Sequence, residues 1–117
     1  MKRKTALLIL FALVFSLLCA SAEAAEKAKD SFDASRFDWY STPKSTCFSY
    51  IGYDEDAEEL AVIFRSNETR TYVYSEFDAD AFDTFSSDSS LGGYYNKNIK
   101  GKYSCTRYDD AGTDVLP

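Results

Sequence analysis

The stretch STCFSYIGYDEDAEELAVIFRSNETRTYVYS, residues 45–75, decides the fold, because it holds three segments with the composition of β-strands. Residues 45–54 are rich in β-branched and aromatic side chains, and an Asp-Glu-Asp turn follows them. Residues 60–65 begin with an apolar run, and residues 69–75 alternate between two faces. Three strands separated by short polar turns predict an antiparallel meander.

A short amphipathic helix is predicted over residues 79–87, where Phe82 and Phe85 form a narrow apolar stripe that would cover one face of the sheet. Residues 94–103 favour a second short helix but also resemble a strand, and an extended piece then carries Cys105. The fold class is therefore α+β. We expect a small three-stranded antiparallel meander packed against a short helix, with a second short helix or strand near the C-terminus.

Residues 1–24 predict a cleavable signal peptide, because three basic residues precede an apolar run of roughly 14 residues and a small-residue cleavage site. A bilayer span needs about 20 apolar residues, so this run is short for an anchor. A lipoprotein with a lipidated Cys19 is the alternative, and only then would the chain contact a membrane. The sequence otherwise predicts a secreted or periplasmic protein.

The rest of the chain predicts one small domain, with a spacer at residues 25–40, the domain at 41–108 and a polar tail at 109–117. Cys47 and Cys105 are the two cysteines left after cleavage. An even pair in a small exported chain is best interpreted as a disulfide.

Charge and composition exclude several classes of function. Cleavage after Ala24 leaves 10 basic and 18 acidic residues, a net charge of −8, which would repel nucleic acid and attract a basic partner. The chain contains no histidine, the commonest general base and metal ligand. Asp54–Glu59 holds the densest acidic cluster, which we interpret as a solvated turn. We therefore predict no catalytic residues, no metal and no cofactor.

Aromatic residues are the strongest positive signal, with 9 Tyr, 9 Phe and 1 Trp in 117 residues. One interpretation is that the tyrosines fill the edge of an undersized core. The other is a binding surface, because tyrosine is a favoured interface residue. The candidate surface comprises Arg70, Tyr72, Tyr74, Tyr94 and Tyr95.

Four motifs in order resemble the KTSC domain family over roughly residues 44–103. They are Ser45-Thr46-x-Phe48-x-x-Ile51-Gly52-Tyr53-Asp54, Leu60-x-Val62-x-Phe64, Tyr72-x-Tyr74, and Ser90-x-Gly92-x-Tyr94-Tyr95-Asn96-x-x-Ile99-Lys100. The resemblance implies a compact domain with no established activity, for which RNA binding has been suggested. It also implies structural roles for Ser45, Thr46, Gly52, Tyr53, Asp54, Gly92, Asn96 and Ile99.

Three functions follow from these features. The leading prediction is a non-enzymatic module that binds a protein in the cell envelope, with an oligomeric state that the sequence leaves open. The second is an inhibitor or immunity protein against a basic enzyme such as lysozyme, since such inhibitors are small, exported and acidic, and the loop at residues 89–94 is weakly similar to theirs. The third is RNA binding through the basic residues Lys97, Lys100, Lys102 and Arg107.

Overall fold

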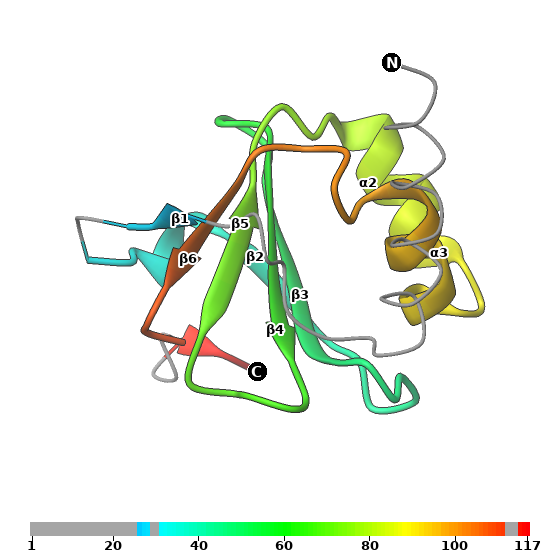
Figure 1. The fold of residues 1–117 in the computed structure, drawn as a ribbon, viewed down its shortest axis with the longest axis horizontal. Helices are drawn as coiled ribbons and strands as arrows, with labels where there is room; N and C mark the ends of the chain where they lie inside the picture. Colours follow the sequence, from blue (N-terminus) through cyan, green and yellow to red (C-terminus); the bar gives the residue numbers. More distant parts are fainter. Residues whose placement is uncertain (1–25, 29–30, 112–114) are drawn as a thin grey trace, which may run out of the picture.

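The computed structural model describes residues 26–28, 31–111 and 115–117 of the chain. The predicted signal peptide and Cys19 lie outside these residues. One sheet of six strands carries two short helices on one face (Figure 1). The strands are β1 (Glu26–Lys27), β2 (Asp38–Ser41), β3 (Phe48–Asp54), β4 (Glu59–Phe64), β5 (Thr71–Tyr74) and β6 (Cys105–Tyr108); the helices are the 3-10 helix η1 (Ala34–Arg36), α2 (Ala79–Ser87) and α3 (Leu91–Asn98).

The sheet has the strand order β1-β6-β5-β4-β3-β2. Every neighbouring pair is antiparallel except β1 and β6, which run parallel. Strands β2 to β5 follow one another in the chain, and β6 returns after the two helices. The two edges of the sheet are therefore built by β1 and β2, the first two strands of the chain.

The main core lies between the helices and the sheet. Phe48 and Phe64 stack in the centre, and Phe85 of α2 and Tyr95 of α3 meet the Phe48 ring edge-on. Helix α2 begins where Asp78 accepts a hydrogen bond from the backbone N–H of Ala81, the usual arrangement of an N-cap. Aromatic side chains from both layers therefore fill this core.

A second, smaller core covers the opposite face of the sheet. Phe32 and Phe37 pack with Ala61 and Val73 of the central strands, and the half-buried Trp39 lies beside them. Gly52 of β3 makes room for this indole, since a Cβ at residue 52 would stand 2.8 Å from Trp39 Cε3. The sheet is thus covered on both faces by side chains.

The predicted three-stranded meander is wrong as a description of the sheet, which is a six-stranded mixed sheet, although the class is α+β. Strands β3, β4 and β5 form an antiparallel meander at its centre. The helix predicted at residues 79–87 is confirmed as α2. The segment predicted at residues 94–103 as a helix or a strand is helical, but α3 begins earlier, at Leu91, and ends at Asn98. Strands β1 and β2 were missed, and β6 was expected only as an extended piece at Cys105, because these strands have two to four residues and little periodicity to reveal them.

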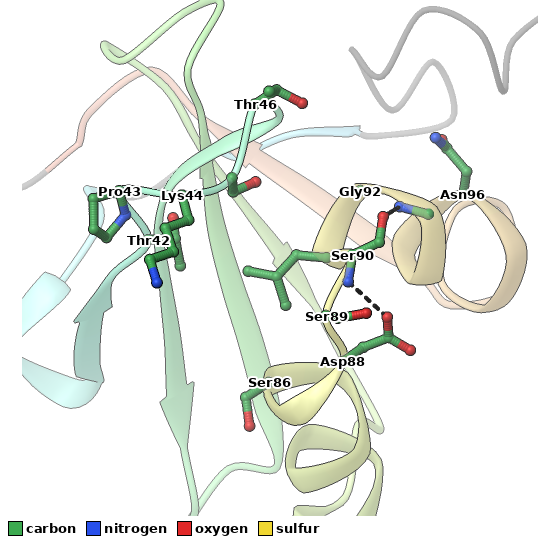
Figure 2. Close-up of a pocket in the computed structure, with 13 residues that line it drawn as sticks. Thr42, Pro43, Lys44, Thr46, Ser86, Asp88, Ser89, Ser90, Gly92 and Asn96 are labelled. Carbon is green, nitrogen blue, oxygen red and sulfur yellow. Dashed lines mark hydrogen bonds between the residues drawn. The ribbon is translucent and has the colours of Figure 1, made fainter.

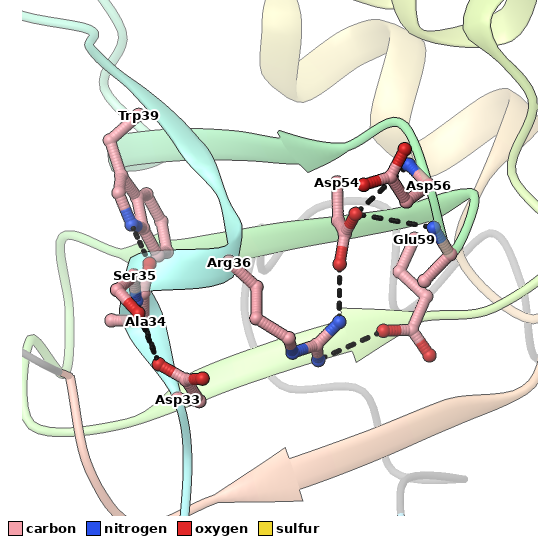
Figure 3. A network of polar contacts seen from close by, with 9 residues as sticks. Asp33, Ala34, Ser35, Arg36, Trp39, Asp54, Asp56 and Glu59 are labelled. Atoms are coloured by element: carbon pink, nitrogen blue, oxygen red, sulfur yellow. Dashed lines mark hydrogen bonds and ion pairs between the residues drawn. The ribbon is translucent and has the colours of Figure 1, made fainter.

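The described part of the predicted spacer at residues 25–40 belongs to the fold instead. It forms β1, η1 and most of β2 and supplies Phe32 and Phe37 to the second core. Arg36 fixes it to the sheet through ion pairs with Asp54 and, at 3.1 Å, with Glu59 (Figure 3). Long-range contacts, rather than local propensity, therefore order this segment.

The predicted disulfide between Cys47 and Cys105 is also wrong, because Cys105 is a free thiol. Cys105 lies three strands away from β3, a lateral distance of about 14 Å, and it aligns through Tyr74 and Leu60 with Tyr53. Cys47 lies six residues before Tyr53, or about 20 Å along the strand direction. A disulfide needs Cα atoms within about 7 Å of each other.

The predicted polar tail begins with an ion-pair centre. Asp109 accepts from Lys27 at 3.2 Å, from Arg70 at 3.2 Å and from Arg107 at 3.3 Å, and so ties β1 and β5 to the end of β6. Ala111 is buried. Within the described residues, no helix is both long and apolar enough to cross a bilayer.

Candidate binding site

A cavity of about 650 Å³ opens between the β2–β3 loop and the start of α3 (Figure 2). We call it the polar pocket. It is lined by residues 42–46 on one side and by Ser86, residues 88–93 and Asn96 on the other. These two segments lie at least 40 positions apart in the chain, and the fold brings them face to face.

The backbone of the β2–β3 loop is held in place by hydrogen bonds from Arg65 and from within the loop. The Arg65 guanidinium donates to the carbonyls of Ser45 at 3.0 Å, Thr42 at 2.9 Å and Phe48 at 2.8 Å. Ser45 Oγ accepts from the N–H groups of Cys47 and Phe48, and so closes the turn into β3. This wall of the polar pocket is therefore preorganised.

The opposite wall is the first turn of α3. Ser90 is its N-cap and accepts from Gly93 N at 3.2 Å, while Asp88 accepts from Ser90 N at 2.8 Å (Figure 2). Gly92 and Gly93 lie in the first turn of α3. Both glycines line the cavity, and a Cβ at residue 93 would stand 2.9 Å from Ser90 Oγ, so the cap leaves no room for a side chain there.

The lining chemistry suits a polar ligand. Ser, Thr and Asn side chains dominate it, Lys44 and Asp88 carry opposite charges, and Pro43 and Leu91 add apolar surface. Hydroxyl and amide groups both donate and accept hydrogen bonds. Ser45 and Ser90 are already engaged as caps, so their oxygens serve the architecture. The arrangement is that of a recognition site for hydrogen-bonding groups.

The predicted tyrosine surface is not present. Tyr72, Tyr74 and Tyr95 lie in the main core with exposed fractions of 6%, 1% and 0%. The hydroxyls of Tyr74 and Tyr95 are hydrogen-bonded to each other at 2.5 Å. Tyr94 is half-buried against Phe85. The fifth predicted residue, Arg70, lies apart from this core and pairs with Asp109.

The tyrosines fail as a surface because both helices cover the sheet face to which Tyr72 and Tyr74 point. Their hydroxyls find partners inside the core, which is how a buried tyrosine is tolerated. Burial raises the pKa of the Tyr74 phenol far above its usual value. Burial also raises the pKa of the neighbouring Cys105 thiol to about 11.

The acidic cluster at Asp54–Glu59 does not form a solvated turn throughout. Asp54 is buried, pairs with Arg36, and accepts from the backbone N–H groups of Asp56 and Ala57 (Figure 3). It therefore shapes the β3–β4 turn. Within the described residues, no group of three or more acidic or cysteine side chains is placed to hold a metal ion.

The motif residues that sequence analysis treated as structural fall into two groups. Tyr53 donates to the Phe77 carbonyl at 2.7 Å, and Ile99 is fully buried in the core, so both have structural roles. Ser45, Thr46, Gly92 and Asn96 line the polar pocket, and Ser45 also has a structural role because its Oγ caps the turn into β3. These four residues could be named from their motifs, but nothing in the sequence indicates that the two motifs lie next to each other in the fold.

The family of the chain follows from comparison with known protein families. The family model of the KTSC domain matches residues 44–103, which is more than half of the chain. The chain belongs to the KTSC domain family. The KTSC segment contains β3, β4, β5, α2 and α3, and it includes most of the polar pocket. Strands β1, β2 and β6 lie outside it.

The solved structures show the same relationship. A crystal structure of a KTSC domain protein from Yersinia pestis is similar to 59% of this chain and to 93% of its own, with 32% sequence identity and a TM-score of 0.54. None of the curated proteins matches the chain. The resemblance predicted from the four motifs is thus confirmed as membership of the KTSC family.

Proposed function

We propose that this KTSC protein is an exported, non-enzymatic module that binds a protein partner in the cell envelope, and that the polar pocket is its binding site. The observation that carries the proposal is the meeting of two separate KTSC motifs at one cavity. The first contributes Ser45 and Thr46, and the second contributes Gly92 and Asn96. Packing of the hydrophobic core alone does not require such a cavity.

A binding role rather than catalysis is supported by how the reactive groups are used. Ser45 and Ser90 act as turn and helix caps, and Asp54 is paired with Arg36. The chain has no histidine that could activate a hydroxyl. The polar pocket therefore offers hydrogen bonds and shape, which are the means of recognition.

The partner is expected to be basic. The predicted processed chain carries a net charge of −8, and the helix beside the polar pocket exposes Asp80, Asp83 and Asp88. Complementary charge accelerates association and selects among partners. Export itself rests on the signal-peptide pattern at residues 1–24.

The test is capture of partners from an envelope extract on immobilised protein. Ser89→Trp places a large ring in the polar pocket, whereas Thr84→Trp places the same ring on the outer side of α2 as a matched control. We expect the native protein and Thr84→Trp to retain the same partner and Ser89→Trp to lose it. Equal capture by all three proteins would rule out the polar pocket as the binding site.

A second candidate is inhibition of a basic envelope-acting enzyme such as lysozyme. The loop that is weakly similar to those of lysozyme inhibitors supplies residues 89–93 to the polar pocket, which favours this candidate. Binding to lysozyme should then weaken with added salt and block its activity in a titration. Lysozyme activity that stays constant at saturating protein would exclude this function.

RNA binding is a weaker proposal for this chain. Of the four basic residues predicted for it, Arg107 is paired with Asp109 at 3.3 Å. The net negative charge also opposes an approaching phosphate backbone. An RNA complex with a steep salt dependence that is lost in Lys97→Glu would revive the proposal.

A further inference from the structure

Strand β2 presents a free edge next to the polar pocket. Within the part of the chain that the structure describes, β3 is the only strand paired with β2. Thr42 N donates to Ser49 O at 3.1 Å, which fixes the phase of the ladder between these strands. Since paired residues alternate in an antiparallel ladder, the backbone groups of Trp39 and Ser41 point away from β3. Such an edge can pair with a strand from another protein.

An aromatic ring lies on this edge. Tyr40 of β2 is 50% exposed, and its ring centroid is 5.9 Å from that of Phe82 in α2. Thr42 lies two residues after Tyr40, just past the end of β2, and Ser86 lies one turn after Phe82 in α2. Both line the polar pocket. The Tyr40 ring and the polar pocket therefore belong to one continuous surface.

The charges around this surface are mostly negative. Asp38 is exposed at the start of β2, and Asp83 and Asp88 are exposed at α2 and its C-cap. Lys44 is the only cation among the described residues that line the polar pocket. Charge complementarity therefore favours a segment that carries lysine or arginine.

We propose that the outer edge of β2 receives an extended basic segment of the partner protein as an additional strand, with Tyr40 as its anchor and the polar pocket at one end. This inference rests on the proposed function and states how the partner binds. Alternate side chains of the added strand lie over Tyr40 and face the acidic helix. The backbone groups of Trp39 and Ser41 supply hydrogen bonds.

The test uses a short fluorescein-labelled peptide in which lysine alternates with valine or threonine, titrated with the full chain. Ser41→Pro removes one of the two N–H groups that point away from β3, so the sheet keeps its own hydrogen bonds while the outer edge loses one of its two donors. We expect Ser41→Pro and Tyr40→Ala each to weaken peptide binding at least about tenfold. Tyr50→Ala, on the opposite face of β3, is the matched control and should bind as the native chain does.

Circular dichroism and thermal melting confirm that each variant is folded before binding is compared. Ser41→Pro keeps every charged side chain and removes a backbone donor, so it separates backbone pairing from charge attraction. Unchanged peptide binding in this variant would overturn strand addition. Equal binding of a peptide with glutamate in place of lysine would overturn the basic specificity. Self-association of the native chain that Ser41→Pro abolishes would assign the edge to a second copy instead.

The failure of this inference is distinguishable from failure of the proposed function. A native chain that ignores the peptide, yet captures an envelope partner in a Ser89→Trp-sensitive manner, overturns only strand addition to β2. If Ser89→Trp captures the partner as well as the native chain does, the polar pocket is not the binding site and the proposed function fails.

Discussion

At the scale of single residues, Gly52 shows how a KTSC motif position acts through packing. It lies in β3 directly under Trp39, whose indole N–H donates to the Ala34 carbonyl at 2.9 Å. The contact joins the KTSC segment to the N-terminal part of the chain. A side chain at residue 52 would therefore disturb the second core rather than the polar pocket.

We expect Gly52→Ala to lower the free energy of unfolding by about 1–3 kcal/mol, because the added methyl group overlaps the indole. Urea unfolding measures the change. In a Trp39→Ala background the same substitution should cost much less, and a double-mutant cycle gives the coupling. Equal losses in both backgrounds would show that Gly52 is required for another reason.

The buried hydroxyl pair provides a second residue-scale prediction. Tyr95→Phe removes one hydroxyl of the Tyr74–Tyr95 pair inside the core, and we expect a loss of about 1–2 kcal/mol of stability. Partner binding should be unchanged, since both rings are buried. A Tyr95→Phe variant with native stability that no longer binds the partner would show that the tyrosines take part in binding.

Cys105 makes stability depend on alkaline pH. Burial raises the pKa of its thiol from 9.0 to about 11 in the folded chain, so the unfolded chain loses the proton first. The stabilisation is therefore complete below pH 9 and is lost as the pH rises through about 11. Tyr74 acts in the same direction at higher pH.

Denaturation midpoints measured on both sides of pH 9 should fall more steeply for the native chain than for Cys105→Ala. Identical slopes would show that the thiol ionises as readily in the folded chain as in the unfolded chain.

At the scale of elements, the β2–β3 loop depends on the side chain of Arg65, which lies directly after the end of β4. Arg65 donates to three carbonyls of this loop, while Arg70, a few residues later, pairs with Asp109 at the surface. The two arginines therefore provide a matched comparison. Only one of them supports the wall of the polar pocket.

We expect Arg65→Gln to cost about 1.5–3 kcal/mol of stability and to speed amide hydrogen exchange at residues 42–48. Arg70→Gln should leave exchange in this loop unchanged. Equal protection of the loop in both variants would mean that the wall is ordered without Arg65.

The elements that could be predicted from sequence are those with a strong local signal. Helix α2 was predicted with its observed bounds, because acidic residues and a Phe82/Phe85 stripe mark it. Strands β1 and β2 had no such signal, since distant contacts order them. Strand β1 pairs with β6 and forms the Lys27–Asp109 ion pair, and β2 pairs with β3. The alternation of Tyr72 and Tyr74 placed them on one face correctly but could not show that helices cover that face.

The polar pocket was out of reach for a related reason. Its residues were recognised within motifs at Ser45–Thr46 and Gly92–Asn96, yet neither motif indicates the other as its neighbour. Only the return of the chain through α2 and α3 brings them together. Tyr40, the exposed ring beside the pocket, lay in a segment that was interpreted as a spacer.

At the scale of the whole molecule, the KTSC segment forms a central unit that the rest of the chain completes. The described residues of 26–41, together with residues 105–111, add strands on both sides of β3–β5 and help to build a core on the face opposite the helices. The segment at 38–41 also creates the free edge beside the polar pocket. The proposed strand-addition surface at the edge of β2 therefore depends on a part of the chain outside residues 44–103.

The most direct test of the binding site is amide chemical-shift mapping of the isotope-labelled protein with its captured partner. We predict that the largest changes fall on Trp39, Ser41 and the residues lining the polar pocket. Changes confined to the β3–β4 turn or to Lys97, Lys100 and Lys102, with the polar pocket unaffected, would contradict the proposed site.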